Sequence, residues 1–240
     1  MSEQSPVFMF DSEDPSMEAA SVAARKTFRY FWRELSWEAR RIVPGFDLTI
    51  AKAAFAEGDK VEHMWFSEID FDGERVYGTL LNSPNELRDL HAGDDVAIAL
   101  GHLEDWMLAG AAVLGGFTVH AMRSQMSDED RSSHDQAWGL PFGDPKRIAL
   151  PPDGDDHPMA LNMADKLVEA LTDNAAAFLA PDDQGWTMLH REALAGNRNV
   201  CALLIEHGAN VNAKTADGKT PRSLAETLDW QRVIDVLQRS

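Results

Sequence analysis

The sequence predicts an α+β fold, in which an antiparallel sheet with packed helices is followed by a small all-α stack of repeated units. In the front part, short β-branched and aromatic runs are joined by tight-turn signals, which favour hairpins and antiparallel pairing. A helical pattern precedes these runs and supplies a helix to cover one face of the sheet. Near the end of the chain, Gly218 follows Gly185 and Thr220 follows Thr187 at the same offset of 33 residues, which is typical of stacked supersecondary units.

The first predicted element is a helix that begins at Asp14-Pro15, because Asp caps free amides and Pro is tolerated at the first helical position. Apolar residues recur every three or four positions and predict one buried face: Met17, Ala20, Ala24, Phe28, Phe31 and Leu35. The helix also carries a basic patch, made of Arg25, Lys26, Arg29 and Arg33. In an acidic front part, we interpret this patch as neutralising neighbouring carboxylates rather than as a nucleic-acid site.

The strands are expected next, at residues 48–55, 61–71, 75–81, 96–100, 103–108 and 115–119. Asp72-Gly73 separates the second and third of these runs and is a strong hairpin signal, because Gly supplies the positive φ of a primed turn. Gly115 and Gly116 lack the lysine of a P-loop and the third glycine of a dinucleotide fingerprint. We therefore interpret them as a bulge or a close backbone approach within the last strand.

The segments after the strands are polar at first and then return to helical spacing. A helix within 123–138 starts near Ser127, where Ser127-Asp128-Glu129-Asp130 forms a Ser-x-x-acid box. Residues 151–156 combine Pro, Gly and Asp, so we expect domains at 8–147 and 159–240, joined by a linker at 148–158. Because two repeats are too few to close a core, the helical residues 159–179 are expected to cap the stack.

The repeated segment contains Gly185-Trp186-Thr187-Met188-Leu189-His190, the apolar run 200–205 and Gly208-Ala209-Asn210, and its second copy begins at Asp217-Gly218-Lys219-Thr220-Pro221. It resembles a pair of ankyrin repeats. The resemblance implies binding rather than chemistry, with the turns near 182–188 and 213–221 as the usual fingers of the partner surface. It also implies that His190 is structural and holds the loop that opens the repeat. Trp186 and Lys219 lie in the turns and are candidate partner contacts.

A second set of motifs lies in the front part: Phe8-Met9-Phe10, Glu62-His63-Met64-Trp65-Phe66, residues 78–82, Gly93-Asp94, Asp105-Trp106-Met107, residues 115–119 and residues 138–145. Together they resemble the bacterial domain-of-unknown-function family 2314, over about residues 8–147. That family has no established activity. The resemblance therefore implies a domain without implying a function.

Composition and charge exclude several classes of function. The chain has 240 residues, a net charge of −18 and one cysteine, Cys201, which excludes an internal disulfide framework and is interpreted as a buried apolar residue. Nucleic acid is not an expected partner, because phosphate binding needs clustered Lys and Arg. A protein with a basic surface suits this charge, and the acidity also serves solubility. The start of the chain lacks the features of a secretory signal, and no run reaches the roughly 20 apolar residues of a membrane span, so we expect a cytoplasmic protein without a membrane partner.

The sharpest candidate surface is an acidic hairpin, whose carboxylates belong to Glu57, Asp59, Glu62, Glu68, Asp70, Asp72 and Glu74. Like charges this close destabilise a hairpin unless a cationic partner or a metal offsets them. The segment lacks the ligand spacing of an EF-hand, so we favour a solvated acidic face over a metal site, and we expect no metal and no cofactor. The candidate partner contacts in this part are Glu62, Glu68, Asp70, Asp72, Glu74 and, outside the hairpin, Trp106.

The function favoured by these patterns is that of a non-enzymatic protein-protein interaction module. An immunity-type protein that captures a basic toxin is one concrete form of it. A hydrolytic or metal-dependent enzyme is an alternative if His63, Glu62 and Asp105 converge in one pocket, although the sequence offers neither a nucleophile motif nor histidines at helical metal spacing. A purely structural ankyrin pair, with its concave face buried against residues 8–147, is the other alternative.

Overall fold

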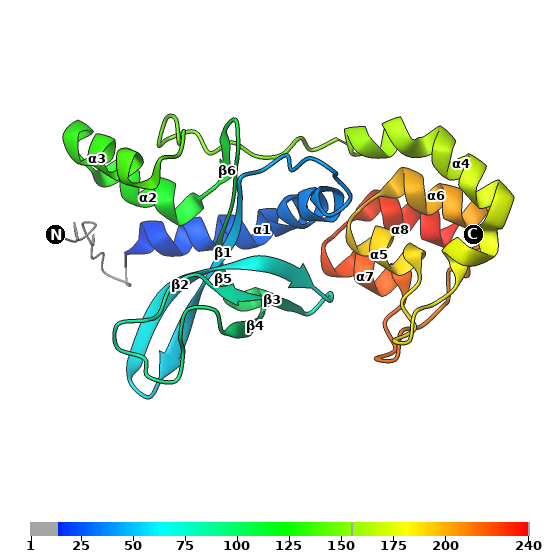
Figure 1. Cartoon of the computed structure of the whole chain (residues 1–240), viewed down its shortest axis with the longest axis horizontal. Coiled ribbons are helices and arrows are strands. Elements are labelled where there is room, and N and C mark those ends of the chain that lie inside the picture. The colour runs from blue at the N-terminus through cyan, green and yellow to red at the C-terminus, as the bar shows by residue number, and fades with distance from the viewer. Residues whose placement is uncertain (1–13, 155, 240) are drawn as a thin grey trace. The chain divides into compact units, whose positions relative to one another are not determined.

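The computed structural model describes residues 14–154 and 156–239, and the chain divides into two compact units after Pro151 (Figure 1). The front unit combines helices with one antiparallel sheet and the second unit is all helical, so the predicted fold class is confirmed. The Phe8-Met9-Phe10 motif and Asp155 of the expected linker lie outside the described residues.

The first helix, α1 (Pro15–Glu38), begins as the sequence predicts, because the Asp14 carboxylate accepts a hydrogen bond of 2.8 Å from the Ser16 amide. In its basic patch, Arg25 donates to the Glu18 carboxylate at 2.9 Å, in agreement with a neutralising role for that residue. The helix packs one apolar face on the sheet. The apolar residues buried on it are Ala24, Phe28, Tyr30, Phe31 and Trp37.

The sheet has six strands in the order β4-β3-β2-β1-β5-β6, and every pairing is antiparallel. The strands are β1 (Leu48–Glu57), β2 (Lys60–Phe71), β3 (Arg75–Leu80), β4 (Asp95–Ala99), β5 (Leu103–Ala109) and β6 (Val113–Gly115), with a short 3₁₀ turn, η1 (Leu100–His102), before β5. Gly73 has φ 93° in the turn between β2 and β3, so the predicted hairpin is confirmed. Strand β4 lies at one edge of the sheet and β6 at the other.

Trp106 in β5 is a core residue, although the sequence nominated it as a partner contact. Its side chain is fully buried, and its indole N–H donates to the Ala24 carbonyl of α1 at 3.0 Å. Phe31 stacks on its ring, with 5.3 Å between ring centroids. A partner has no access to this side chain, so its role is to join helix and sheet.

The expected strand at 115–119 is wrong beyond Gly115. Strand β6 ends there, Gly116 takes the left-handed conformation with φ 70°, and helix α2 (Phe117–Gln125) follows. The cause is the buried Asp105 carboxylate, which accepts the amides of Phe117 and Thr118, each at 2.8 Å, and the Thr118 hydroxyl at 2.7 Å. This cap from β5 outweighs the strand preference of a β-branched run.

Two further elements cover the second face of the sheet near β1 and β5. Helix α3 (Asp128–Trp138) begins at the predicted cap, where the Ser127 hydroxyl accepts the Asp130 amide at 3.1 Å. The segment that follows α3 in the sequence places Phe142 in the core cluster of this face. The buried members of that cluster are Ile50, Met107, Ala109, Val113, Val119 and Phe142.

The second unit consists of one long helix and two helix pairs. They are α4 (Pro158–Leu179), which has a non-helical residue at Asn174, then α5 (Met188–Leu194) with α6 (Arg198–Glu206), and α7 (Pro221–Thr227) with α8 (Gln231–Gln238). Helix α4 contacts α5 and α6, and the two pairs pack α5 on α7 and α6 on α8. Cys201 is fully buried between these helices, as expected. The pairs repeat at the offset seen in the sequence, since Thr187 and Thr220 cap α5 and α7 in the same way.

Candidate interaction surfaces

The two turns that precede α5 and α7 form a continuous ribbon, here called the finger ribbon (residues 182–186 and 215–219). In the first turn, the Asp182 carboxylate accepts the Trp186 amide at 2.9 Å, and Gly185 supplies the positive φ of 77° that the turn needs. In the second, the Lys219 carbonyl accepts the Thr215 amide at 3.0 Å. The two turns are joined directly, because the carbonyl of residue 184 accepts the amide of residue 216 at 2.8 Å.

His190 fixes the second turn to the first repeat. Burial lowers its pKa, so the ring is neutral near pH 7. Its Nδ1 accepts the Thr187 amide at 3.1 Å, which leaves Nε2–H to donate toward the carbonyls of Ala213 and Lys219, at 3.1 and 3.2 Å. The structural role implied by the ankyrin resemblance is therefore confirmed. At the equivalent place in the second repeat stands Ser223, whose hydroxyl bonds to the backbone of Thr220 within its own turn.

Trp186 is partly exposed on the finger ribbon. Arg191 of α5 lies over its ring, with 5.5 Å from guanidinium carbon to centroid, and also donates to Asp182 at 2.6 Å. The arrangement holds the indole in place without covering it fully, as a rigid aromatic contact for a partner requires. Lys219 contributes its backbone to the turn, through its carbonyl and through an amide that donates to the Thr215 hydroxyl at 3.0 Å.

Carboxylates of the acidic hairpin, Glu62 and Asp72 among them, hold loops of the front unit. Glu62 accepts the amides of residues 85, 86 and 87, and although desolvation acts to raise its pKa, these bonds lower it overall. Asp72 accepts the amides of Glu74 and Arg75, each at 2.8 Å, and the hydroxyl of Tyr77 at 2.9 Å, a bond that raises the pKa of Tyr77. The carboxylates of Glu62 and Asp72 therefore have a structural role in the front unit.

A β-bulge redirects the Glu68 carboxylate of the hairpin. The register of β2 against β3 shifts between Ser67 and Asp70, and Glu68 takes the left-handed conformation with φ 54°. Its carboxylate accepts the Thr79 hydroxyl at 3.0 Å, and Asp95 of β4 lies 3.3 Å from the same hydroxyl. Asp95 was missed in the sequence because only sheet order places it beside Glu68. The exposed acidic group therefore extends to the edge strand.

The three residues of the catalytic alternative do not converge. Neighbouring strand residues point to opposite faces, so Glu62 lies against the loop at 85–87 whereas His63 bonds Glu104 at 2.8 Å. Asp105 is buried beneath α2, where burial raises its pKa against the opposing effect of its hydrogen bonds. Within 14–154 and 156–239, no three His, Cys, Asp or Glu side chains are grouped so as to hold a metal.

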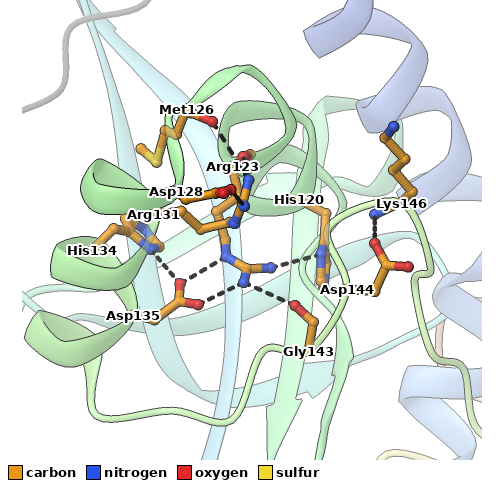
Figure 2. Close-up of polar contacts among 10 residues, drawn as sticks. All are labelled: His120, Arg123, Met126, Asp128, Arg131, His134, Asp135, Gly143, Asp144 and Lys146. Atoms are coloured by element: carbon orange, nitrogen blue, oxygen red, sulfur yellow. Dashed lines mark hydrogen bonds and ion pairs between the residues drawn. The ribbon is translucent and has the colours of Figure 1, made fainter.

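A buried polar cluster ties α2 to α3 and to the segment that follows (Figure 2). Arg123 donates to both carboxylate oxygens of Asp135, at 2.7 and 2.6 Å, and to the Gly143 carbonyl at 3.0 Å. The same guanidinium lies 3.2 Å from His120 Nδ1, and burial together with Arg123 lowers the pKa of His120 to about 4. His134 contacts Asp135 at 3.0 Å. This cluster therefore anchors the motif at 138–145 through the Gly143 carbonyl.

An antiparallel α+β unit followed by a short stack with a continuous finger ribbon defines an ankyrin-type protein-interaction module. The chain belongs to the family described as an uncharacterized protein conserved in bacteria, DUF2314, whose model matches residues 14–142. An ankyrin repeat model matches residues 184–216, which include the first helix pair and the start of the second turn. Both resemblances are therefore confirmed.

Relatives fall into those that share the whole chain and those that share one part. A protein of Neisseria meningitidis serogroup B, named as an ankyrin repeat protein, is 39% identical over 246 residues, covering 98% of this chain and 97% of the relative. A human protein with fibronectin type 3 and ankyrin repeat domains is 55% identical over 42 residues, 17% of this chain and 12% of its own length. The Escherichia coli protein YegJ is 24% identical over 74 residues, 30% of this chain and 48% of its own.

Over the part of the chain that the structure describes, no helix combines the length and the apolar character needed to cross a membrane.

Proposed function

We propose that this protein is a non-enzymatic capture module of the bacterial cytoplasm, which binds a partner protein with a basic surface. The observation that supports the proposal most strongly is the finger ribbon, with Trp186 held in place and partly exposed. Ankyrin turns with an anchored aromatic side chain are suited to protein contacts, because a rigid ring loses little conformational entropy on binding.

The charge of the chain supports the basic character of the partner. The net charge is −18, and Glu68 and Asp95 gather their carboxylates around one hydroxyl group of the sheet. Such a field raises the association rate of a cationic protein and disfavours nucleic acid. A protein toxin with a basic active-site surface, such as a nuclease, is the concrete partner that we propose, and the present chain would act as its immunity protein.

Affinity capture from the native cell tests the proposal. Tagged full-length protein is compared with Trp186→Ala and with Gln238→Ala, an exposed and uncharged residue of α8 that serves as the matched control. We expect one basic protein that is retained at low salt, reduced at moderate salt, absent with Trp186→Ala and present with the control. A preparation without a partner, or an acidic partner, contradicts the proposal.

The toxin form has its own test. Cells that express the captured protein alone should lose viability, and co-expression of the present chain should restore it, whereas the Trp186→Ala variant should not. Unaffected viability in the absence of the present chain rejects the immunity role and leaves the capture of a basic protein intact.

A further inference from the structure

The free edge of β4 is an open hydrogen-bonding surface. In the β3–β4 pair, Leu80 N–H donates to the Asp94 carbonyl at 2.9 Å, and Leu100 N–H donates to the Glu74 carbonyl at 3.2 Å. These bonds fix which residues of β4 bond to β3, because such pairs alternate along an antiparallel ladder. The residues between them turn their backbone groups away from β3.

By that alternation, the residues with outward amides are Asp95, Ala97 and Ala99, in register with Thr79, Tyr77 and Arg75. Strand β4 pairs with β3 alone, and the outward amides have no hydrogen bond to any other residue within 14–154 and 156–239. A row of amides of this kind is a template for another strand.

The opposite edge of the sheet differs. Strand β6 has three residues, and the amide of Gly115 donates to the Ala149 carbonyl at 2.9 Å. The segment around Ala149 therefore occupies part of the β6 edge. The edge formed by β4 is the one at which a strand can be added.

Side chains around β4 indicate what kind of strand fits. Ala97 and Ala99 are exposed and short, so they leave room beside Tyr77, which is itself 36% exposed. Val96 and Ile98 point to the buried side, with 8% and 7% exposure. An added strand therefore meets an open face on one side and an apolar face on the other, and it needs alternating polar and apolar side chains.

Charge determines the sign of the polar side chains. Strand β4 carries Asp95 and no Lys or Arg, and the bulge in β2 brings the Glu68 carboxylate to the same Thr79 hydroxyl. Edge carboxylates repel a second copy of a chain with net charge −18 and attract a cationic segment.

We propose that the free edge of β4 binds an extended segment of a partner protein with Lys or Arg at alternate positions, which adds as a further strand of the sheet. This inference rests on the proposed function, since it names the part of the basic partner that the front unit binds. Main-chain hydrogen bonds supply the affinity, and Glu68 and Asp95 select the charge.

The test uses full-length, ¹⁵N-labelled protein and two synthetic peptides of eight residues. One peptide has Lys at every second position and the other has Glu there, and Val or Thr occupies the positions between them. In 50 mM salt we expect the Lys peptide to shift the amide signals of Asp95, Ala97 and Ala99 and to slow their hydrogen exchange about tenfold, which is the fold-change expected when an exposed amide becomes hydrogen-bonded in about nine molecules of ten. The Glu peptide should do neither.

Ala97→Pro removes an outward amide without removing a bond to β3, because the Ala97 N–H points away from that strand. It should abolish the response, whereas Ala97→Val, which keeps the amide, should preserve it; both variants must show the wild-type spectrum elsewhere. The proposal is overturned if Ala97→Pro binds the Lys peptide as well as the wild type does, or if both peptides give the same response. It is also overturned if the signal shifts are confined to the finger ribbon, or if they appear without peptide when the protein concentration is raised.

The two proposals fail separately. If Ala97→Pro captures the basic partner as well as the wild type does while Trp186→Ala loses it, the edge proposal is wrong and the proposed function stands. If both variants and the wild type capture no basic protein, the proposed function is wrong even where the Lys peptide binds at β4.

Discussion

Replacing His190 by Ala should loosen the second turn of the finger ribbon. The substitution removes the acceptor of the Thr187 amide and the donor that reaches the carbonyls of Ala213 and Lys219, and the ring is fully buried. A net loss of about 1 kcal/mol for each of these interactions, together with buried groups left without a partner, gives a destabilisation of the second unit of roughly 2–4 kcal/mol.

Ser223→Ala is the matched control, because Ser223 occupies the same place in the second repeat. It is exposed, and its hydroxyl acts within its own capping turn, so the expected cost is about 0.5–1 kcal/mol. The contrast between the two variants isolates the contacts that link one repeat to the next turn.

Native-state amide exchange is the appropriate assay, since a chain with two units has no single free energy of unfolding. We expect faster exchange at residues 215–219 in His190→Ala and little change in the front unit. Equal costs for both variants, or unchanged exchange in the second turn, would refute the reasoning from His190 to the finger ribbon.

Three further predictions concern the front unit. The pKa of His120 is lowered from 6.5 to about 4, so the stability of the front unit is retained above pH 6.5 and falls by up to about 3 kcal/mol as the pH drops from 6.5 to 4. Urea unfolding, followed through the NMR signals of the front unit, should show a larger loss in the wild type than in His120→Gln. Asp105→Asn should destabilise the unit by about 2–4 kcal/mol, because its new NH₂ group faces donors, whereas the exposed Asp128→Asn should cost under about 0.5 kcal/mol in the same unfolding experiment. Gly115→Ala, with φ 75° and a Cβ that clashes with the Trp106 carbonyl, should strongly lower the melting temperature of the front unit, followed through its own NMR signals, and Gly101→Ala, with open space around it, should not.

Much of the fold could be predicted from local signals. Helix α1 follows from Asp14-Pro15 and its apolar spacing, the β2–β3 hairpin from Asp72-Gly73, and the finger ribbon from the repeat. In each case the residues that determine the structure lie within a few positions of the element they form. Sequence reasoning is strongest under this condition.

The predictions that were wrong or incomplete concern residues whose environment is determined by parts of the chain distant in sequence. Helix α2 depends on Asp105, which lies 12 residues before the Phe117 amide that it caps, and this distance hides the cap from any local pattern. The sequence leaves Trp106 open between a core residue and a partner contact, and only the packing of α1 over it decides for the core. The bulge at Glu68 and the order of the strands together place Glu68 and Asp95 beside the same Thr79 hydroxyl. The alternation of polar residues along one strand does not reveal this proximity.

The most direct test of the account is the affinity of the captured partner for the full-length protein, measured by isothermal titration at 50 and 200 mM salt with the wild type, Trp186→Ala and Gln238→Ala. The account predicts that the wild type and Gln238→Ala bind alike, that affinity falls with salt, and that Trp186→Ala loses at least about 2 kcal/mol, the usual threshold for an interface hot spot. Salt-independent binding that Trp186→Ala leaves intact would contradict the claim that the finger ribbon captures a basic protein.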